Sequence, residues 1–163
     1  VWLALQDQEY ARFESVSTIV FLIFAQVIWP VLVPLSILFI ERDKKRKILL
    51  RMFSVVGLIV GSFLGYRILQ YDVKAEISDL HINYILNFPS FNLNYKGILY
   101  FVATVLPAFV SSVKWMNYFA VGILGTFLIT ELFFPNHLVS VWCFFAAILS
   151  ALIFFILRKQ KKD

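Results

Sequence analysis

The chain has 163 residues, of which 61% are hydrophobic, 18% aromatic and 15% charged, and its mean hydropathy is +0.82. A soluble domain usually has about 45–50% apolar and about 25% charged residues, so one core in so short a chain cannot bury all this apolar surface, and lipid must cover the rest. The net charge of +5 does not indicate a nucleic-acid partner, because the basic residues cluster at the ends of apolar segments, where they act as topology signals.

The chain begins with the apolar stretch Val1-Trp2-Leu3-Ala4-Leu5, which has no initiator Met, basic flank or small-residue cleavage site. It is therefore not a signal peptide. It is typical of the end of an apolar segment whose beginning is missing, and we expect the sequence to be part of a longer protein. The single cysteine, Cys143, lies in an apolar stretch and excludes an internal disulfide.

Five further apolar segments have about the length that a membrane helix needs, which is roughly 20 residues for a bilayer core about 30 Å thick. Helices are expected because unpaired backbone groups cannot face lipid, and the strict alternation of a membrane barrel is absent. The predicted membrane segments are residues 15–40, 48–69, 98–113, 115–134 and 138–157. The sequence thus predicts an all-α polytopic membrane bundle that forms a single domain over residues 1–163.

The distribution of Lys and Arg predicts the orientation of this bundle. With five crossings, the basic loop 41–47 and the basic tail after Arg158 fall on one side, together with Lys114. Most acidic residues fall on the other side. Because cytoplasmic loops carry the excess of Lys and Arg, the basic side is predicted to be cytoplasmic.

The longest connection, residues 70–96, is then an outer loop. After a polar start, Ile82, Tyr84 and Leu86 alternate with other residues. After a break at Pro89-Ser90, Phe91, Leu93 and Tyr95 alternate with Asn92 and Asn94. Period-two alternation on both sides of such a break predicts a small β-hairpin. We expect this hairpin to lie over the outer mouth of the bundle as a lid.

Gly57, Gly61 and Gly65 repeat every four residues and therefore share one face of the second predicted helix. Small residues in such a row let another helix backbone approach closely. We favour packing inside the bundle over the alternative of an oligomer interface.

Two prolines predict kinks at mid-membrane depth. Pro30 cannot donate to the carbonyl of Gln26, and we expect the Gln26 side chain or the Trp29 indole to help satisfy it. Pro107 has the same effect in the third segment, beside Thr104. Two kinked helices can open a polar cavity, or the kinks can serve packing alone.

Glu131 is the one acid within the fourth apolar segment, about one turn from its outer end. An acid there is costly and indicates either function or a structural ion pair. Arg67 ends the second segment at a similar depth and is the expected partner in a pair. The competing interpretation is that Glu131 handles a ligand or a proton.

His81, Asp79, Glu131 and His137 all fall on the predicted outer side, and zinc takes such ligands. No two of them have a spacing that fixes metal geometry on one helix, so no metal site is predicted. Nucleophile-elbow, phosphate-loop and Cys-x-x-Cys motifs are absent, and no cofactor is expected.

Three stretches of the sequence resemble an uncharacterised bacterial family of seven-helix membrane proteins, a domain of unknown function. The stretches are Phe24-Ala25-Gln26-Val27-Ile28-Trp29-Pro30-Val31-Leu32-Val33-Pro34, His81-Ile82-Asn83-Tyr84 and Val139-Ser140-Val141-Trp142-Cys143-Phe144-Phe145-Ala146-Ala147-Ile148-Leu149-Ser150. The resemblance implies seven helices, with the amino terminus outside and the carboxyl terminus inside. It implies no activity. Val1-Trp2 looks like the end of a Glu-Gly-x-x-Trp motif of the family, so the Glu and Gly and about one and a half helices are missing here.

We therefore expect a bacterial inner-membrane protein with an outward-facing pocket that binds or passes a small ligand. The pocket is predicted to be lined by Gln26, Trp29, His81, Thr104, Glu131, His137 and Trp142. One alternative is a membrane-embedded, metal-dependent hydrolase that uses the outer His and acidic residues. Another is a structural or assembly subunit, in which the polar residues serve packing alone.

Overall fold

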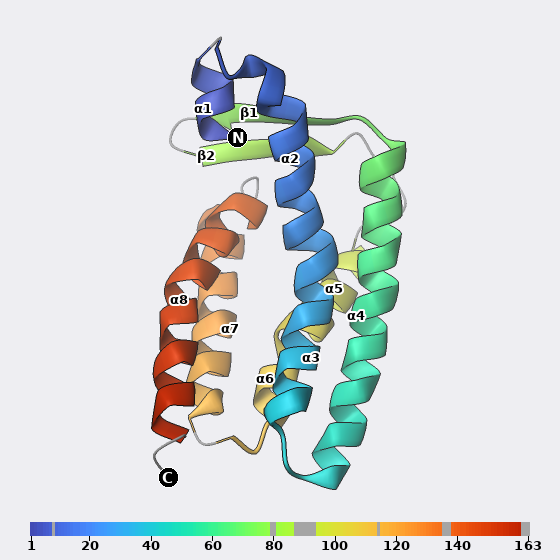
Figure 1. Ribbon diagram of the computed structural model, residues 1–163, viewed down its shortest axis with the longest axis vertical. Coiled ribbons are helices and arrows are strands. Elements are labelled where there is room, and N and C mark those ends of the chain that lie inside the picture. The colour runs from blue at the N-terminus through green and yellow to red at the C-terminus, as the bar shows by residue number, and fades with distance from the viewer. Residues whose placement is uncertain (8, 79–80, 87–93, 114, 135–137, 161–163) are drawn as a thin grey trace.

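The computed structural model describes residues 1–7, 9–78, 81–86, 94–113, 115–134 and 138–160. It is a bundle of long helices with a two-stranded sheet across one end (Figure 1). Its elements are α1 (Trp2–Gln6), η1 (Ala11–Phe13), α2 (Glu14–Leu22), η2 (Ile23–Ile28), α3 (Trp29–Ile40), α4 (Lys44–Gln70), β1 (Val73–Ser78), β2 (His81–Leu86), α5 (Asn94–Thr104), α6 (Leu106–Val110), α7 (Met116–Phe133) and α8 (Leu138–Gln160). We call the end that holds the sheet the outer end and the opposite end the basic end.

The first long helix runs without a break from η1 to the end of α3, so residues 11–40 form the element predicted over 15–40. Three residues then connect it to α4, and a connection this short forces the two helices to pack as antiparallel neighbours. Asp43 begins α4 as its N-cap, because its carboxylate accepts a hydrogen bond from the Arg46 N–H at 2.9 Å.

The third predicted segment differs from the expectation. It begins at Asn94 instead of Ile98, it is interrupted at Val105, and its second part ends at Val110 instead of Val113. The interruption comes two residues before Pro107, which has no N–H to continue the helical pattern. The last two helices, α7 and α8, follow the predicted segments 115–134 and 138–157 closely.

Three stretches within the described residues are long and apolar enough to cross a membrane, namely Ala11–Ile40, Lys44–Gln70 and Met116–Phe133. Large apolar side chains remain exposed along them, for example Val20, Leu58 and Leu128. Such a surface suits lipid better than water. The count of five crossings stays a prediction.

The outer loop contains a small antiparallel sheet, in which β1 pairs with β2 from Val73 opposite Leu86 to Ser78 opposite His81. A hairpin was predicted here, but its placement was wrong. The two paired strands end at Ser78 and begin again at His81 instead of flanking residues 89–90, and Tyr95, expected in the second strand, belongs to α5. Residues 73–78 also alternate, and their polar character concealed a strand that has one face toward solvent. Residues 87–93 lie outside the described part.

The glycine row of α4 packs inside the bundle. A Cβ on Gly57 would lie 2.8 Å from the carbonyl carbon of Pro30, and one on Gly61 would lie 2.7 Å from the carbonyl oxygen of Val27. Gly65 meets only the flexible side chain of Val27. The row therefore lets α4 approach the backbone of the first helix more closely than any residue with a side chain would allow.

A buried carboxylate closes the basic end. Glu41 accepts hydrogen bonds from the N–H groups of Arg42 and Asp43 at 2.8 and 3.0 Å. It also accepts from both the N–H, at 2.6 Å, and the hydroxyl of Ser112. Beside it, the guanidinium of Arg46 donates to the carbonyl of Val110 at 2.9 Å. These bonds tie the α3–α4 connection to the end of α6.

Burial alone would raise the pKa of Glu41, but hydrogen bonds from the Ser112 side chain and from three backbone N–H groups lower it to about 2. Because this pKa lies below the ordinary value of 4.5, the ionised carboxylate stabilises the fold above about pH 4.5. That contribution is lost as the pH falls from about 4.5 through about 2.

Gly57→Ala is expected to lower the free energy of unfolding by about 1–3 kcal/mol, because its methyl group collides with backbone that cannot move aside. The control is Gly125→Ala in α7, where an added Cβ meets nothing within 4 Å. That control is expected to be neutral or stabilising by up to about 1 kcal/mol, since Ala favours helix. Thermal unfolding in detergent measures both variants, and equal stability of the two would contradict the close-packing role of Gly57.

Candidate functional site

The first helix contains a π-helical turn, η2, immediately before Pro30. In this turn the N–H of Trp29 donates to the carbonyl of Phe24, five residues back instead of four. The next bond in the same register would run from residue 30 to the carbonyl of Ala25, and Pro30 has no N–H to form it. The carbonyl that Pro30 deprives is therefore that of Ala25, and the prediction that it is Gln26's was off by one residue.

The phenol of Tyr100, from α5, satisfies this carbonyl by donating a hydrogen bond to it at 2.6 Å. Neither the Gln26 side chain nor the Trp29 indole does so, in contrast to the expectation. Because an unsatisfied carbonyl is costly in an apolar setting, this bond fixes α5 against η2.

Aromatic rings surround Tyr100 on the side of the bundle that holds α7 and α8. Its ring meets that of Trp142 edge to face, with centroids 5.9 Å apart, and Trp142 meets Phe127 in the same way at 5.3 Å. Nearer the outer end, Phe21 of α2 stacks on Tyr84 of β2 at 5.0 Å. Elements far apart in the chain thus contribute to one aromatic region beneath the sheet.

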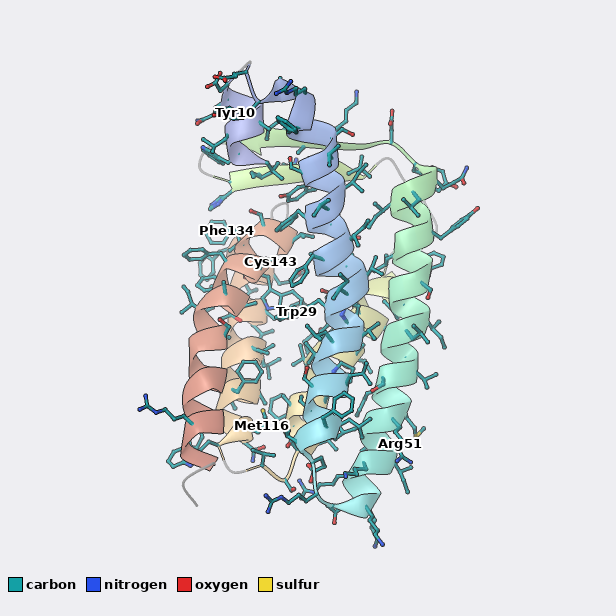
Figure 2. All side chains as sticks on the ribbon, in the orientation of Figure 1. Tyr10, Trp29, Arg51, Met116, Phe134 and Cys143 are labelled. Carbon is teal, nitrogen blue, oxygen red and sulfur yellow. The ribbon has the colours of Figure 1, made fainter. Side chains whose placement is uncertain are left out.

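Cys143 joins these rings. It follows Trp142 in α8 and lies near the outer end of that helix, on the side toward the first helix (Figure 2). Burial, with a smaller effect of Cys143, raises the pKa of Tyr84. We call Phe21, Tyr84, Tyr100, Trp142 and Cys143 the aromatic cluster.

Gln26 lies in η2 next to Ala25, and its side-chain oxygen is buried without a hydrogen-bond partner among the described residues. The hydroxyl of Thr18, two turns nearer the outer end, is also buried without a hydrogen-bond partner among these residues. A buried amide oxygen without a partner carries a free-energy penalty. Gln26 is therefore the polar group of this region that most needs a donor.

The seven predicted pocket residues fall into separate places. Gln26 and Trp142 lie beside Tyr100 or its bonded carbonyl, and Thr104 is buried in the same helix as Tyr100, with its hydroxyl donating to the Tyr100 carbonyl at 2.8 Å. Trp29 is half-buried, with its ring 6.1 Å from that of Phe24. These residues belong to the middle of the bundle.

The other predicted residues belong to the outer end. His81 is in β2, with its ring edge to face against that of Phe134 at 5.1 Å. Glu131 is exposed near the end of α7. His137 lies outside the described residues. In the part of the chain that the structure describes, no group of three His, Cys, Asp or Glu residues is arranged to hold a metal ion.

The predicted pair of Arg67 and Glu131 is not brought together. Arg67 is buried on α4, with its guanidinium over the rings of Phe63 and Tyr71 at 5.7 and 5.9 Å. Figure 1 shows α4 and α7 on opposite flanks of the central first helix. This arrangement of the described residues gives the ion pair no support.

A family model matches residues 13–163, almost the whole chain, and its description is a family of unknown function, DUF6629. The chain belongs to the DUF6629 family. No curated protein and no solved structure matches it. The resemblance to an uncharacterised family is thereby confirmed, whereas seven helices and bacterial origin stay expectations.

In this DUF6629 chain the aromatic cluster contains residues that the sequence did not mark as functional, namely Phe21, Tyr84, Tyr100 and Cys143. Tyr84 and Cys143 stood within the stretches that carry the family resemblance, which was the available signal. The sequence carried no such signal for Tyr100, because a tyrosine in an apolar helix cannot be told from an ordinary packing residue until its hydrogen-bond partner is known.

Tyr100→Phe is expected to lower the free energy of unfolding by about 1–3 kcal/mol, because it keeps the ring contacts but leaves the Ala25 carbonyl buried without a donor. Tyr118→Phe, which removes an exposed hydroxyl from α7, is the matched control and is expected to change stability little. Thermal unfolding in detergent compares them. A similar small effect in both variants would mean that the Tyr100 bond does not hold α5 to η2.

Proposed function

We propose that this protein is an integral protein of the bacterial inner membrane that binds a small, ring-bearing ligand at the aromatic cluster beneath its outer sheet. The long apolar helices and their exposed apolar side chains support the membrane placement. The α3–α4 connection and the carboxyl end lie at the same end of the bundle (Figure 1), which supports a cytoplasmic basic end.

The observation that carries the proposal is the buried side-chain oxygen of Gln26, which has no hydrogen-bond partner in the part of the chain that the structure describes. A membrane bundle that needed only packing would gain stability from an apolar side chain here. A polar acceptor held next to the Tyr100-bonded turn instead suits a ligand that brings its own donor. The purely structural alternative instead requires the Gln26 side chain to stabilise the fold, so it predicts that removing this oxygen lowers the free energy of unfolding.

The side chains of the cluster indicate the chemistry of the ligand. Phe21 stacks on Tyr84, and Trp142 packs edge to face on Tyr100, so a flat aromatic body would suit a region that already consists of packed rings. The amide oxygen of Gln26 requires an N–H or O–H donor. A small aromatic molecule with one such donor combines both features, and indole is the simplest probe with this chemistry.

The alternative of a metal-dependent hydrolase rests on the outer residues His81, Glu131 and His137. His81 packs on an aromatic ring and Glu131 is exposed, so neither observation favours catalysis over solvation. The binding proposal is the one that a specific contact pattern supports.

The experiment uses Cys143 as the reporter, because it is the only thiol in the chain and belongs to the cluster. The rate at which N-ethylmaleimide alkylates it in the detergent-solubilised protein is measured with and without millimolar indole. We expect indole to slow alkylation several-fold. Gln26→Leu is expected to abolish this protection while leaving stability unchanged or raised, since it removes an unpartnered buried polar atom.

Thr18→Val is the matched control, because it removes the other unpartnered polar atom of the same helix, two turns from Gln26. This variant should retain the protection by indole. If indole leaves the alkylation rate of the unmodified protein unchanged, the cluster does not bind such ligands. Destabilisation by Gln26→Leu would favour the structural interpretation.

The sidedness is tested separately in a Cys143→Ser background. A membrane-impermeant maleimide applied to intact cells should label Lys74→Cys in the sheet, because β1 is proposed to be outside. It should label Lys45→Cys, at the start of α4, only after the cells are permeabilised. Labelling of Lys45→Cys in intact cells would reverse the proposed orientation.

A further inference from the structure

The first two turns of α4 carry a dense group of cations at the basic end. Lys44, Lys47 and Arg51 are spaced three and four residues apart, so they lie on one side of the helix. Lys44 and Arg51 are exposed, and Figure 2 shows Arg51 near the basic end of α4. We call these three residues the cationic stripe.

The nearby carboxylates are already engaged by other groups. Glu41 is buried and accepts four hydrogen bonds, from Arg42, Asp43 and Ser112, and Asp43 caps the first turn of α4. Among the described residues, no carboxylate forms an ion pair with a residue of the stripe, and Asp163 lies outside them. Arg46, another cation of the first turn of α4, donates to the Val110 carbonyl instead. The stripe therefore keeps its positive charge for an external partner.

An apolar surface continues the same side of α4 toward the middle of the bundle. Ile48, Met52 and Val55 follow at helical spacing and are 60%, 61% and 57% exposed. With a rise of about 1.5 Å per residue, Arg51 stands roughly 10 Å beyond Lys44 along the axis. The cations thus begin at the basic end of the helix, and the apolar band begins beside Lys47, lies on both sides of Arg51 and extends toward the middle of the bundle.

We infer that this face of α4 binds the headgroup of an anionic phospholipid through Lys44, Lys47 and Arg51, with the acyl chains lying along Ile48, Met52 and Val55. A phospholipid is the occupant that joins a phosphate directly to apolar chains, in the order in which the helix presents its side chains. A free phosphate would use only the cations. The inference rests on the proposed membrane placement, but not on the ligand at the aromatic cluster.

Native mass spectrometry of the full chain in detergent tests the inference by counting bound lipids during titration with dioleoyl-phosphatidylglycerol or dioleoyl-phosphatidylcholine. We expect clear preference for the phosphatidylglycerol. A cation near an anionic surface contributes about 1 kcal/mol, which is about fivefold in affinity. Lys44→Gln/Arg51→Gln should therefore weaken phosphatidylglycerol binding on the order of 25-fold and phosphatidylcholine binding little.

The matched control is Arg12→Gln/Lys74→Gln, which removes the same charge from exposed residues at the outer end. It should leave phosphatidylglycerol binding unchanged. Equal binding of the two lipids, or equal loss in the two double variants, would overturn the inference. So would inorganic phosphate if, at the same concentration, it displaced the lipid completely, because the site would then recognise the free anion alone. None of these outcomes depends on the indole experiment.

Discussion

The need to satisfy backbone carbonyls in an apolar interior constrains this fold more than any other requirement. Pro30 has no N–H, so the first helix lacks one backbone donor near its middle. Because the turn before Pro30 is π-helical, the carbonyl left without this donor is that of Ala25. The hydroxyl of Tyr100 donates a hydrogen bond to this carbonyl, so a local defect in the first helix fixes the position of α5. Without water to take its place, this bond has no substitute.

The same turn sets how α4 packs. Pro34 cannot donate to the carbonyl of Pro30, and this carbonyl faces Gly57, where the close approach permits a weak Cα–H···O contact. The carbonyl of Val27 faces Gly61 in the same way. At the basic end, the Glu41 carboxylate accepts a hydrogen bond from the Ser112 N–H and so joins the α3–α4 connection to the segment after α6. Each of these contacts joins segments through backbone groups, so small changes of side chain there are expected to have large effects on stability.

The outer half of the bundle has a different character. Its polar atoms are gathered around rings from α2, β2, α5 and α8, and at Gln26 one of them is left without a donor. Natural cores rarely retain such a group without a reason. At the basic end the buried carboxylate has hydrogen-bond partners, whereas in the middle of the bundle the Gln26 oxygen has none among the described residues. This contrast is the physical basis for proposing a ligand site beneath the sheet, away from the exposed Glu131.

The sequence by itself determined that this protein is mostly helical and where most of its helices lie, because long apolar segments and their basic flanks are local features. The glycine spacing also predicted close packing by α4. Only the tertiary structure decided which carbonyl Pro30 deprives, since a π-helical turn shifts the hydrogen-bond register by one residue and sequence periodicity does not show it. It also decided which strands pair, that Tyr100 meets Trp142 and the carbonyl of Ala25, and that α4 and α7, which carry Arg67 and Glu131, lie on opposite flanks of the first helix. Contacts between distant segments depend on how the helices are arranged around one another.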